Sequence, residues 1–172
     1  MRPLIIANWK MNPVDSKEAL DLALTITKEM RDIEADVVLC PPFVYVPQLL
    51  ASQNVFIGAQ DCFWEQEGPY TGQVSPEMLR NLGCSYVIVG HSERERFVNE
   101  TMEMVQKKVR AAIQAGIVPV VCIGDYDVQM RGILEGLSLK DVSKIVLVYE
   151  PVWAISTNPG SKSATAKDVK DA

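Results

Sequence analysis

Histidine is nearly absent from this sequence, which has one, His91, among its 172 residues. The four cysteines are widely separated, form no C-x-x-C pair and have no histidine at metal-ligand spacing, which argues against a zinc site or a disulfide framework and predicts reduced core thiols. Long apolar runs are also missing, and the apolar stretch near the start is too short for a signal peptide. We therefore expect a cytoplasmic protein.

Basic residues are not in excess either, because the net charge is −5. Nucleic acids and anionic membranes attract clustered lysine and arginine, so we expect neither as a partner. A small anionic ligand is still compatible with this charge, since one lysine in a cleft creates a local positive potential. The glycine-rich fingerprints G-x-G-x-x-G and G-x-x-x-x-G-K-[ST] of common nucleotide sites do not occur.

The sequence does contain short β-branched runs that alternate with helix-like segments. The runs have no polar alternation, as is typical of parallel strands covered on both faces, and lie near residues 4–8, 36–40, 55–59, 86–90, 118–123 and 144–149. Apolar spacing and capping residues predict helices over 15–31 and 99–115, a short helix opening at Ser75-Pro76, and a weaker one over 126–137. This alternation predicts a single α/β domain over residues 1–172, and both a doubly wound sheet and a (β/α) barrel fit it.

Three predicted strands are followed at once by residues that can take part in catalysis. Lys10 follows the first run, His91 the fourth and Glu150 the sixth. Because parallel strands present their carboxyl ends at one edge, these side chains are expected to meet there. Each alone also has an ordinary explanation: a solvated lysine, a hydrogen-bonded core histidine, or a glutamate in a surface ion pair.

Six short motifs decide between these explanations, and together they resemble the triosephosphate isomerase family. They occur in the family's order along nearly the whole chain. Two of them contain the segments Gly-His-Ser-Glu and Tyr-Glu-Pro-Val-Trp, which together are highly specific for the family. The motifs are Asn8-Trp-Lys10-Met-Asn12, Gly58-Ala-Gln-Asp61, Tyr70-Thr-Gly72, Val89-Gly-His91-Ser-Glu-Arg94, Val121-Cys-Ile-Gly124 and Tyr149-Glu-Pro-Val-Trp-Ala-Ile155.

The resemblance implies a TIM-type (β/α) barrel and an isomerase of glycolysis and gluconeogenesis. Such an enzyme interconverts dihydroxyacetone phosphate and D-glyceraldehyde 3-phosphate through an enediolate, without a cofactor or a metal. By the same resemblance, Glu150 is the base, and enclosure increases its basicity. His91 is the neutral electrophile that donates a hydrogen bond to the developing oxyanion, and Lys10 is the cation that binds substrate.

The resemblance also implies further residues around this site. Asn8 and Ser156 join Lys10 in binding substrate. Glu93 orients Lys10, Ser92 is a partner of the base, and Cys122 lies near the base, although a core thiol explains Cys122 equally well.

Two longer segments also have counterparts in the family. Residues 151–162 resemble the lid that closes over the phosphate and excludes water. The long polar loop 60–74 resembles the loop that reaches into a neighbouring subunit, which implies a homodimer.

The chain departs from the family pattern in several places. It has about six of the eight βα units of a complete barrel, so we expect weak or absent turnover from this chain alone. Ser156 replaces a glycine in a lid that is longer than usual, and Glu95 stands where a second arginine is common. The alternative is a non-catalytic truncated barrel that acts as a scaffold or interaction module. A second alternative is another phosphate-binding barrel enzyme, such as a relative of the indole-glycerol-phosphate or phosphoribosyl isomerase enzymes. Those enzymes lack the motifs of Lys10, His91 and Glu150 in combination, which disfavours this alternative.

Overall fold

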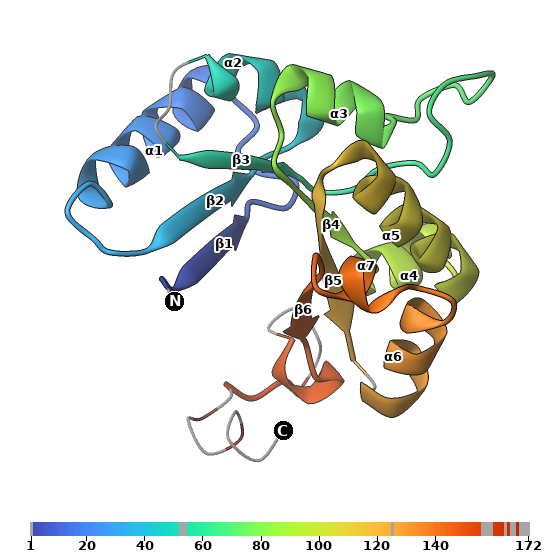
Figure 1. Ribbon diagram of the computed structural model, residues 1–172. Helices are drawn as coiled ribbons and strands as arrows, with labels where there is room; N and C mark the ends of the chain where they lie inside the picture. The colour runs from blue at the N-terminus through green and yellow to red at the C-terminus, as the bar shows by residue number, and fades with distance from the viewer. Residues whose placement is uncertain are drawn as a thin grey trace.

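The computed structural model describes residues 2–51, 55–124, 126–155, 160–163, 165 and 168. Its strands form one parallel sheet whose spatial order, β1 to β6, is the order of the chain. A doubly wound sheet reverses its strand order at a switch point, so the sequential order excludes that alternative. Figure 1 shows the sheet curling from β1 round to β6 as part of a (β/α) barrel. The strands are β1 Leu4–Asn8, β2 Asp36–Cys40, β3 Phe56–Ala59, β4 Tyr86–Val89, β5 Val118–Ile123 and β6 Val146–Tyr149.

The helices lie on the convex side of this sheet (Figure 1). Short 3-10 turns also occur at Phe43–Tyr45 and Val152–Ala154. No helix among the described residues has the length and apolar character needed to cross a membrane. The helices are α1 Ser16–Glu29, α2 Val46–Leu50, α3 Pro76–Leu82, α4 Ser92–Val98, α5 Met102–Ala115, α6 Tyr126–Leu134 and α7 Leu139–Val142.

Side-chain caps set the start of the helices that the sequence predicts. The Asp15 carboxylate accepts hydrogen bonds from the amides of Lys17 and Glu18 at 2.8 and 3.0 Å, which fixes the start of α1. Ser75 and Thr101 cap α3 and α5 in the same way. These residues satisfy amide groups that have no partner inside the helix.

Two helix predictions have wrong boundaries. The helix predicted over 99–115 begins at Met102 instead, as α5. Asn99 is not part of it, because its left-handed φ of 54° ends the preceding helix α4. The weaker helix predicted over 126–137 ends with Leu134, since Gly136 has a φ of 69°. The helices α2 and α7 were not predicted.

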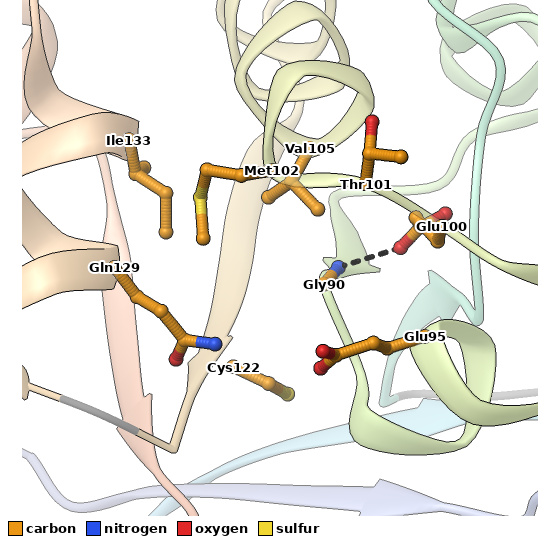
Figure 2. A pocket seen from close by; sticks show the side chains of 9 residues that line it. All are labelled: Gly90, Glu95, Glu100, Thr101, Met102, Val105, Cys122, Gln129 and Ile133. Atoms are coloured by element: carbon orange, nitrogen blue, oxygen red, sulfur yellow. Dashed lines mark hydrogen bonds between the residues drawn. The ribbon is translucent and has the colours of Figure 1, made fainter.

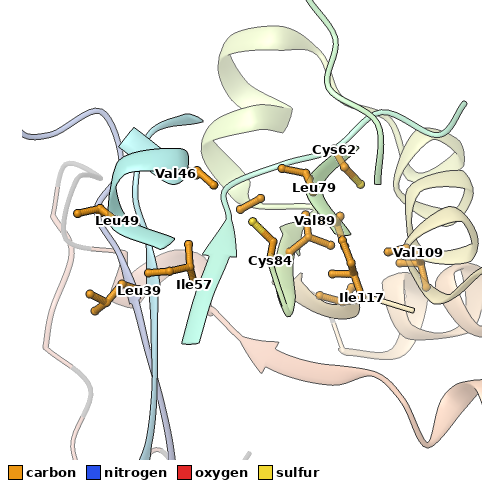
Figure 3. Packing of buried hydrophobic residues seen from close by; sticks show 14 of the residues in the cluster. Leu39, Val46, Leu49, Ile57, Cys62, Leu79, Cys84, Val89, Val109 and Ile117 are labelled. Carbon is orange, nitrogen blue, oxygen red and sulfur yellow. The ribbon is translucent and has the colours of Figure 1, made fainter. Parts of the chain in front are cut away.

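Buried apolar side chains cover both faces of the central strands β2 to β5, as the unbroken apolar runs predicted, whereas β1 and β6 have no fully buried residue. Alternate strand residues face the helices, and Figure 3 shows this outer layer around Leu39, Ile57 and Val89. The other residues form a smaller inner cluster of Val38, Cys40, Ile88, Val120 and Cys122. The prediction that the four cysteines lie in the core is confirmed, because all four are buried, and none of them forms a disulfide here.

Candidate active site

Lys10 follows the carboxyl end of β1, and side chains form hydrogen bonds with both its backbone amide and its backbone carbonyl. The Asn8 carboxamide oxygen accepts a hydrogen bond from the Lys10 amide at 2.9 Å. The Gln60 amide group, just beyond β3, donates to the carbonyl oxygens of Lys10 at 2.7 Å and Cys40 at 2.8 Å. These contacts tie the ends of β1, β2 and β3 together at the point where Lys10 turns into the site.

The Lys10 ammonium group reaches the residue that was expected to orient it. Lys10 Nζ lies 2.6 Å from Glu93 Oε1, and both side chains are about one third exposed. The other carboxylate oxygen of Glu93 lies 3.8 Å from His91 Nδ1. Glu93 therefore links the cation from β1 to the imidazole from β4.

His91 follows β4 and caps the short helix α4 with its own ring. Its Nδ1 atom accepts a hydrogen bond from the Glu93 amide at 3.2 Å, so the proton of a neutral ring sits on Nε2. The side chain is 9% exposed. This arrangement leaves Nε2–H as a fixed donor that points away from the helix.

The Nε2 atom faces the carboxylate of Glu150. His91 Nε2 and Glu150 Oε2 are 3.8 Å apart, beyond hydrogen-bond distance. Glu150 follows β6, and its amide donates to the Ile123 carbonyl at 2.8 Å. Its Oε2 atom is buried and has no hydrogen-bond partner within the described part of the chain. The unpaired Glu150 oxygen and the His91 Nε2–H donor are therefore both available to a bound substrate.

Cys122, the penultimate residue of β5, lies beside Glu150 on the inner face of the sheet. Burial, together with the negative charge of Glu150, holds the pKa of the Cys122 thiol far above its ordinary range. The thiol is therefore protonated at neutral pH, so Cys122 is not a nucleophile. Its position next to Glu150 agrees with the prediction that it lies near the base.

An open cavity of about 210 Å³ gives access to this edge of the sheet. Asn8, Lys10 and His91 line it, so the cation and the imidazole face common solvent. The remaining lining residues are Met11, Gln60, Glu93, Arg94 and Val98.

The other predicted site residues have different outcomes. Ser92 begins α4 and is partly buried, so its proximity to His91 follows from the chain, while its role stays a prediction. Ser156 and the lid residues 157–159 lie outside the described residues. On either side of residues 156–159, in the segment predicted as a lid, the Lys162 amide donates a hydrogen bond to the Trp153 carbonyl at 2.9 Å.

The loop 60–74 connects β3 to α3 and is built around aromatic side chains. The Phe63 ring packs against Trp64 and Tyr70 with centroid distances of 4.0 and 4.7 Å. Lys107 of α5 lies over the Trp64 ring at 5.6 Å. The loop is therefore tied to the body of the molecule, while Tyr70 remains 40% exposed.

Sequence reasoning missed Gln60 as a contributor to this site. The Gly58-Ala-Gln-Asp61 motif supports the family resemblance but assigns no role to Gln60. The only local signal is a polar residue directly after a strand, since its contact with Lys10 joins residues that are 50 positions apart.

Comparisons with known proteins agree with this geometry. A sequence model of the family described as triosephosphate isomerase matches residues 3–172. The triosephosphate isomerase of Thermoanaerobacter pseudethanolicus is 42% identical over 186 aligned residues, covering 99% of this chain and 73% of the relative. That of Alkaliphilus oremlandii is 44% identical over 184 residues, covering 98% and 74%.

A solved structure gives the same result for the fold. The crystal structure of triosephosphate isomerase from Bartonella henselae superposes with a TM-score of 0.74 at 32% sequence identity, covering 89% of this chain and 69% of that one. The order of strands, the residues at their carboxyl ends and these similarities together show that the chain belongs to the triosephosphate isomerase family.

Proposed function

We propose that the chain interconverts dihydroxyacetone phosphate and D-glyceraldehyde 3-phosphate as an isomerase of central carbon metabolism in the cytoplasm. The observation that carries this proposal is the pair formed by His91 Nε2 and Glu150 Oε2, 3.8 Å apart, with the carboxylate oxygen buried and unpaired. A base and a hydrogen-bond donor separated in this way suit a substrate whose carbon is deprotonated while its carbonyl oxygen gains charge.

The proton and electron movements follow from these positions. The Glu150 carboxylate takes a proton from the carbon next to the carbonyl, and the electron pair of that C–H bond forms a carbon–carbon double bond. The carbonyl electrons move to oxygen, where His91 Nε2–H donates a hydrogen bond to the enediolate. The hydroxyl proton on the deprotonated carbon passes to the former carbonyl oxygen, with the His91 ring placed beside both oxygens, and the electrons left on the first oxygen form the new carbonyl. The carbon–carbon double-bond electrons take the proton back from Glu150 at the former carbonyl carbon, and the carboxylate is regenerated.

Lys10 supplies the positive charge for this anionic substrate. Its ammonium group lies in the open cavity, paired with Glu93 at 2.6 Å rather than released to solvent. A fixed cation lowers the energy of a developing negative charge more than a mobile one does, because no reorganisation is needed. We assign phosphate contacts to the lid around Ser156 by family resemblance, and Asn8 a supporting role in holding Lys10.

The experiment is a coupled assay for glyceraldehyde 3-phosphate. It is run on the 172-residue chain and on the same chain extended by the C-terminal βα units of the Thermoanaerobacter relative. We expect turnover in the extended protein and weaker turnover in the chain alone, because six parallel strands leave the barrel open. Absence of turnover in both, with the fold intact, would reject the enzyme and favour a scaffold.

The matched variants test the role of the base. Glu150→Gln should lower kcat by about 10²- to 10⁴-fold with a smaller change in KM, the usual contribution of a general base. Glu29→Gln, at the exposed end of α1, removes the same charge away from the site and should leave kcat unchanged. An unchanged kcat for Glu150→Gln would show that another residue is the base.

The chain also has features of a homodimer that forms through the loop 60–74. Large apolar side chains are exposed, including Met11, Val14 and Phe97 at 89%, 94% and 68%, and Tyr70 in the loop is 40% exposed. Exposed apolar side chains of this size favour a protein partner, and self-association is the arrangement in the family. Light scattering on the eluted protein should give twice the mass of one chain, and a folded monomer would contradict this part of the proposal.

A further inference from the structure

A buried cluster of four charged side chains lies directly behind His91. It consists of Asp61 after β3, Arg94 in α4, Glu100 between α4 and α5, and Lys108 in α5. The side chains of Lys108, Glu100 and Asp61 are 4%, 2% and 8% exposed, whereas that of Arg94 is 34% exposed. Two cations and two carboxylates make the cluster neutral overall.

Each carboxylate in the cluster contacts both cations. Asp61 lies 2.7 Å from Lys108 Nζ and 2.8 Å from Arg94 Nη2. Glu100 Oε1 accepts from Arg94 Nε at 2.9 Å and also from Lys108 Nζ. Buried charges are tolerated where they are paired and hydrogen-bonded in this way, and such a network holds its members in one arrangement.

The electrostatic surroundings of the two carboxyl groups differ. Burial raises the pKa of Asp61 despite the opposing effects of Lys108 and Arg94. For Glu100, burial acts in the same direction, but the hydrogen bonds and charges of Lys108 and Arg94 outweigh it and lower the pKa below its usual value. Glu100 is thus the firmly ionised member of the cluster.

Glu100 is also the member that contacts the backbone next to the imidazole. Its Oε2 atom accepts a hydrogen bond from the Gly90 amide at 3.2 Å, shown as the dashed line in Figure 2. Gly90 has a left-handed φ of 71°, and an added Cβ there would lie 3.1 Å from Val105 and 3.3 Å from the Cys122 carbonyl. The residue that precedes His91 is therefore fixed by packing and by one charged acceptor.

The backbone after His91 is fixed by the same cluster. The Arg94 amide donates to the His91 carbonyl at 2.8 Å, and the Arg94 carbonyl accepts from the Glu100 amide at 3.2 Å. The Arg94 guanidinium group in turn bonds to Asp61 and Glu100. Glu100 thus acts on both sides of the histidine, through Gly90 and through Arg94.

We propose that Glu100 is a positioning residue for His91, and that Arg94 and Lys108 hold its carboxylate in place for this role. The consequence for catalysis rests on the proposed function, but the effect on the ring does not. A shift of the Gly90 peptide would rotate the His91 ring and move Nε2–H away from Glu150. Misplacement of a catalytic group by about 1 Å can cost on the order of 10²-fold in rate.

The test uses the fact that His91 is the chain's only histidine, so its imidazole nitrogen signals are identified without ambiguity. In Glu100→Gln the side-chain amide has one acceptor oxygen where the carboxylate has two. It cannot satisfy the two cations and also accept from the Gly90 amide. In the ¹⁵N-labelled 172-residue chain, we expect the unaltered protein to give one sharp pair of His91 nitrogen signals with Nε2 protonated, and Glu100→Gln to shift and broaden them.

Two control variants separate positioning from a loss of charge or stability. Glu103→Gln removes an exposed carboxylate in the first turn of α5 and should leave the His91 signals unchanged. Asp61→Asn removes a charge from the same cluster but none of the contacts with Gly90, so it should lower stability while largely preserving those signals. Equal His91 shifts in Asp61→Asn and Glu100→Gln, or no shift in either, would overturn the proposal.

A measurement on the unaltered protein covers the case in which Glu100→Gln does not fold. The Gly90 amide should exchange with solvent as slowly as that of Val89 in β4, and exchange as fast as in exposed loops would reject the contact. In the assay, Glu100→Gln should lower kcat about 10- to 100-fold with KM changed less than about threefold. If neither the unaltered chain nor its extended form shows turnover, the proposed function fails, and the His91 signals still decide the positioning role.

Discussion

Lys10 has a backbone conformation that residues with a Cβ atom rarely adopt, with a φ of 54°. The left-handed region costs such a residue roughly 1–2 kcal/mol, which the surrounding contacts must offset. Asn8 and Gln60 supply them through hydrogen bonds to the amide and carbonyl of Lys10. Strain at the residue that presents the cation suggests that this conformation is kept for function rather than for stability.

Two substitutions of Lys10 separate these contributions. Lys10→Gly removes the strain and the ammonium group, and the greater chain entropy of glycine offsets part of the gain, so the free energy of unfolding should stay within about 1 kcal/mol of the original. Lys10→Met removes the ammonium group but keeps the strained backbone, so it should be the less stable of the two. Both should lose about 10- to 100-fold in kcat/KM, the value of a charged hydrogen bond. Urea unfolding and the coupled assay measure the two effects.

Lys17→Met is the control, since this lysine pairs with Asp21 on an exposed face of α1. It should change neither kcat/KM nor the unfolding midpoint appreciably, as expected for an isolated surface pair. If Lys10→Gly retained full activity, or lost several kcal/mol of stability, the interpretation of Lys10 as a strained substrate-binding residue would be wrong.

The three catalytic residues that sequence analysis predicted share one property: each closely follows a predicted strand. Lys10, His91 and Glu150 could be placed together because parallel strands deliver their ends to one edge. Glu100 could not be placed in this way, and Gln60 directly follows a predicted strand but its role could not be inferred from that position. Their importance depends on contacts with Lys10 and Gly90, and those contacts exist only after β3 and the α4–α5 connection have packed against neighbouring elements.

At the scale of elements, β2 and β3 approach closely at Gly58. A Cβ atom added there would lie 2.7 Å from Cys40 Sγ and 3.1 Å from Val38. Both neighbours belong to the inner apolar cluster, where close packing leaves little room for displacement. Gly58 is therefore required by the space between the strands, since its own φ is ordinary.

Gly58→Ala should lower the free energy of unfolding by about 1–3 kcal/mol, the usual cost of inserting one carbon into a packed core. Cys40→Ala alone should also destabilise, because it leaves a small cavity. The double variant should be more stable than the sum of the two changes predicts, since removal of Sγ makes room for the new methyl group. Urea unfolding of the four proteins at one temperature measures this coupling.

The rescue should be partial, because the added methyl group also approaches Val38 and the Cβ of Tyr86 at 3.3 Å. Strictly additive effects in the double variant would show that Cys40 Sγ is not the obstacle. A comparable cycle with Cys84→Ala is a suitable control, since Cys84 is equally buried but is absent from the contacts of Gly58.

The strands themselves were predicted to within about two residues, because each is a continuous β-branched run. Helix boundaries were less accurate, because the helix predicted over 99–115 begins at Met102 and the one predicted over 126–137 ends at Leu134. Asn99 has a left-handed φ of 54° and ends α4, and Thr101 caps α5. An asparagine does not by itself indicate a left-handed residue, so the apolar spacing alone placed the start of the helix too early.

At the scale of the whole molecule, the sheet has two edges that differ from its centre. In the part of the chain that the structure describes, β1 pairs only with β2 and β6 only with β5. Leu147 and Tyr149 on β6 are 40% and 44% exposed, and Ile5 on β1 is 44% exposed. Unpaired edges with exposed apolar residues open more readily than strands that are paired on both sides.

Hydrogen exchange of the 172-residue chain should therefore be graded across the sheet. Amides of β4 and β5, which lie between paired neighbours and beneath α5, should exchange slowest, and those of β6 should exchange at least about tenfold faster, as expected for an edge that opens locally. Extension by the βα units of the Thermoanaerobacter relative should slow β6 toward the rate of β5, because the new strand pairs with its free edge. A dilution series controls for self-association through the same edges, since protection from a second copy falls with concentration. Concentration-independent protection of β6 equal to that of β5 in the unextended chain would contradict the open edge, because an unpaired strand has no partner for half of its backbone groups.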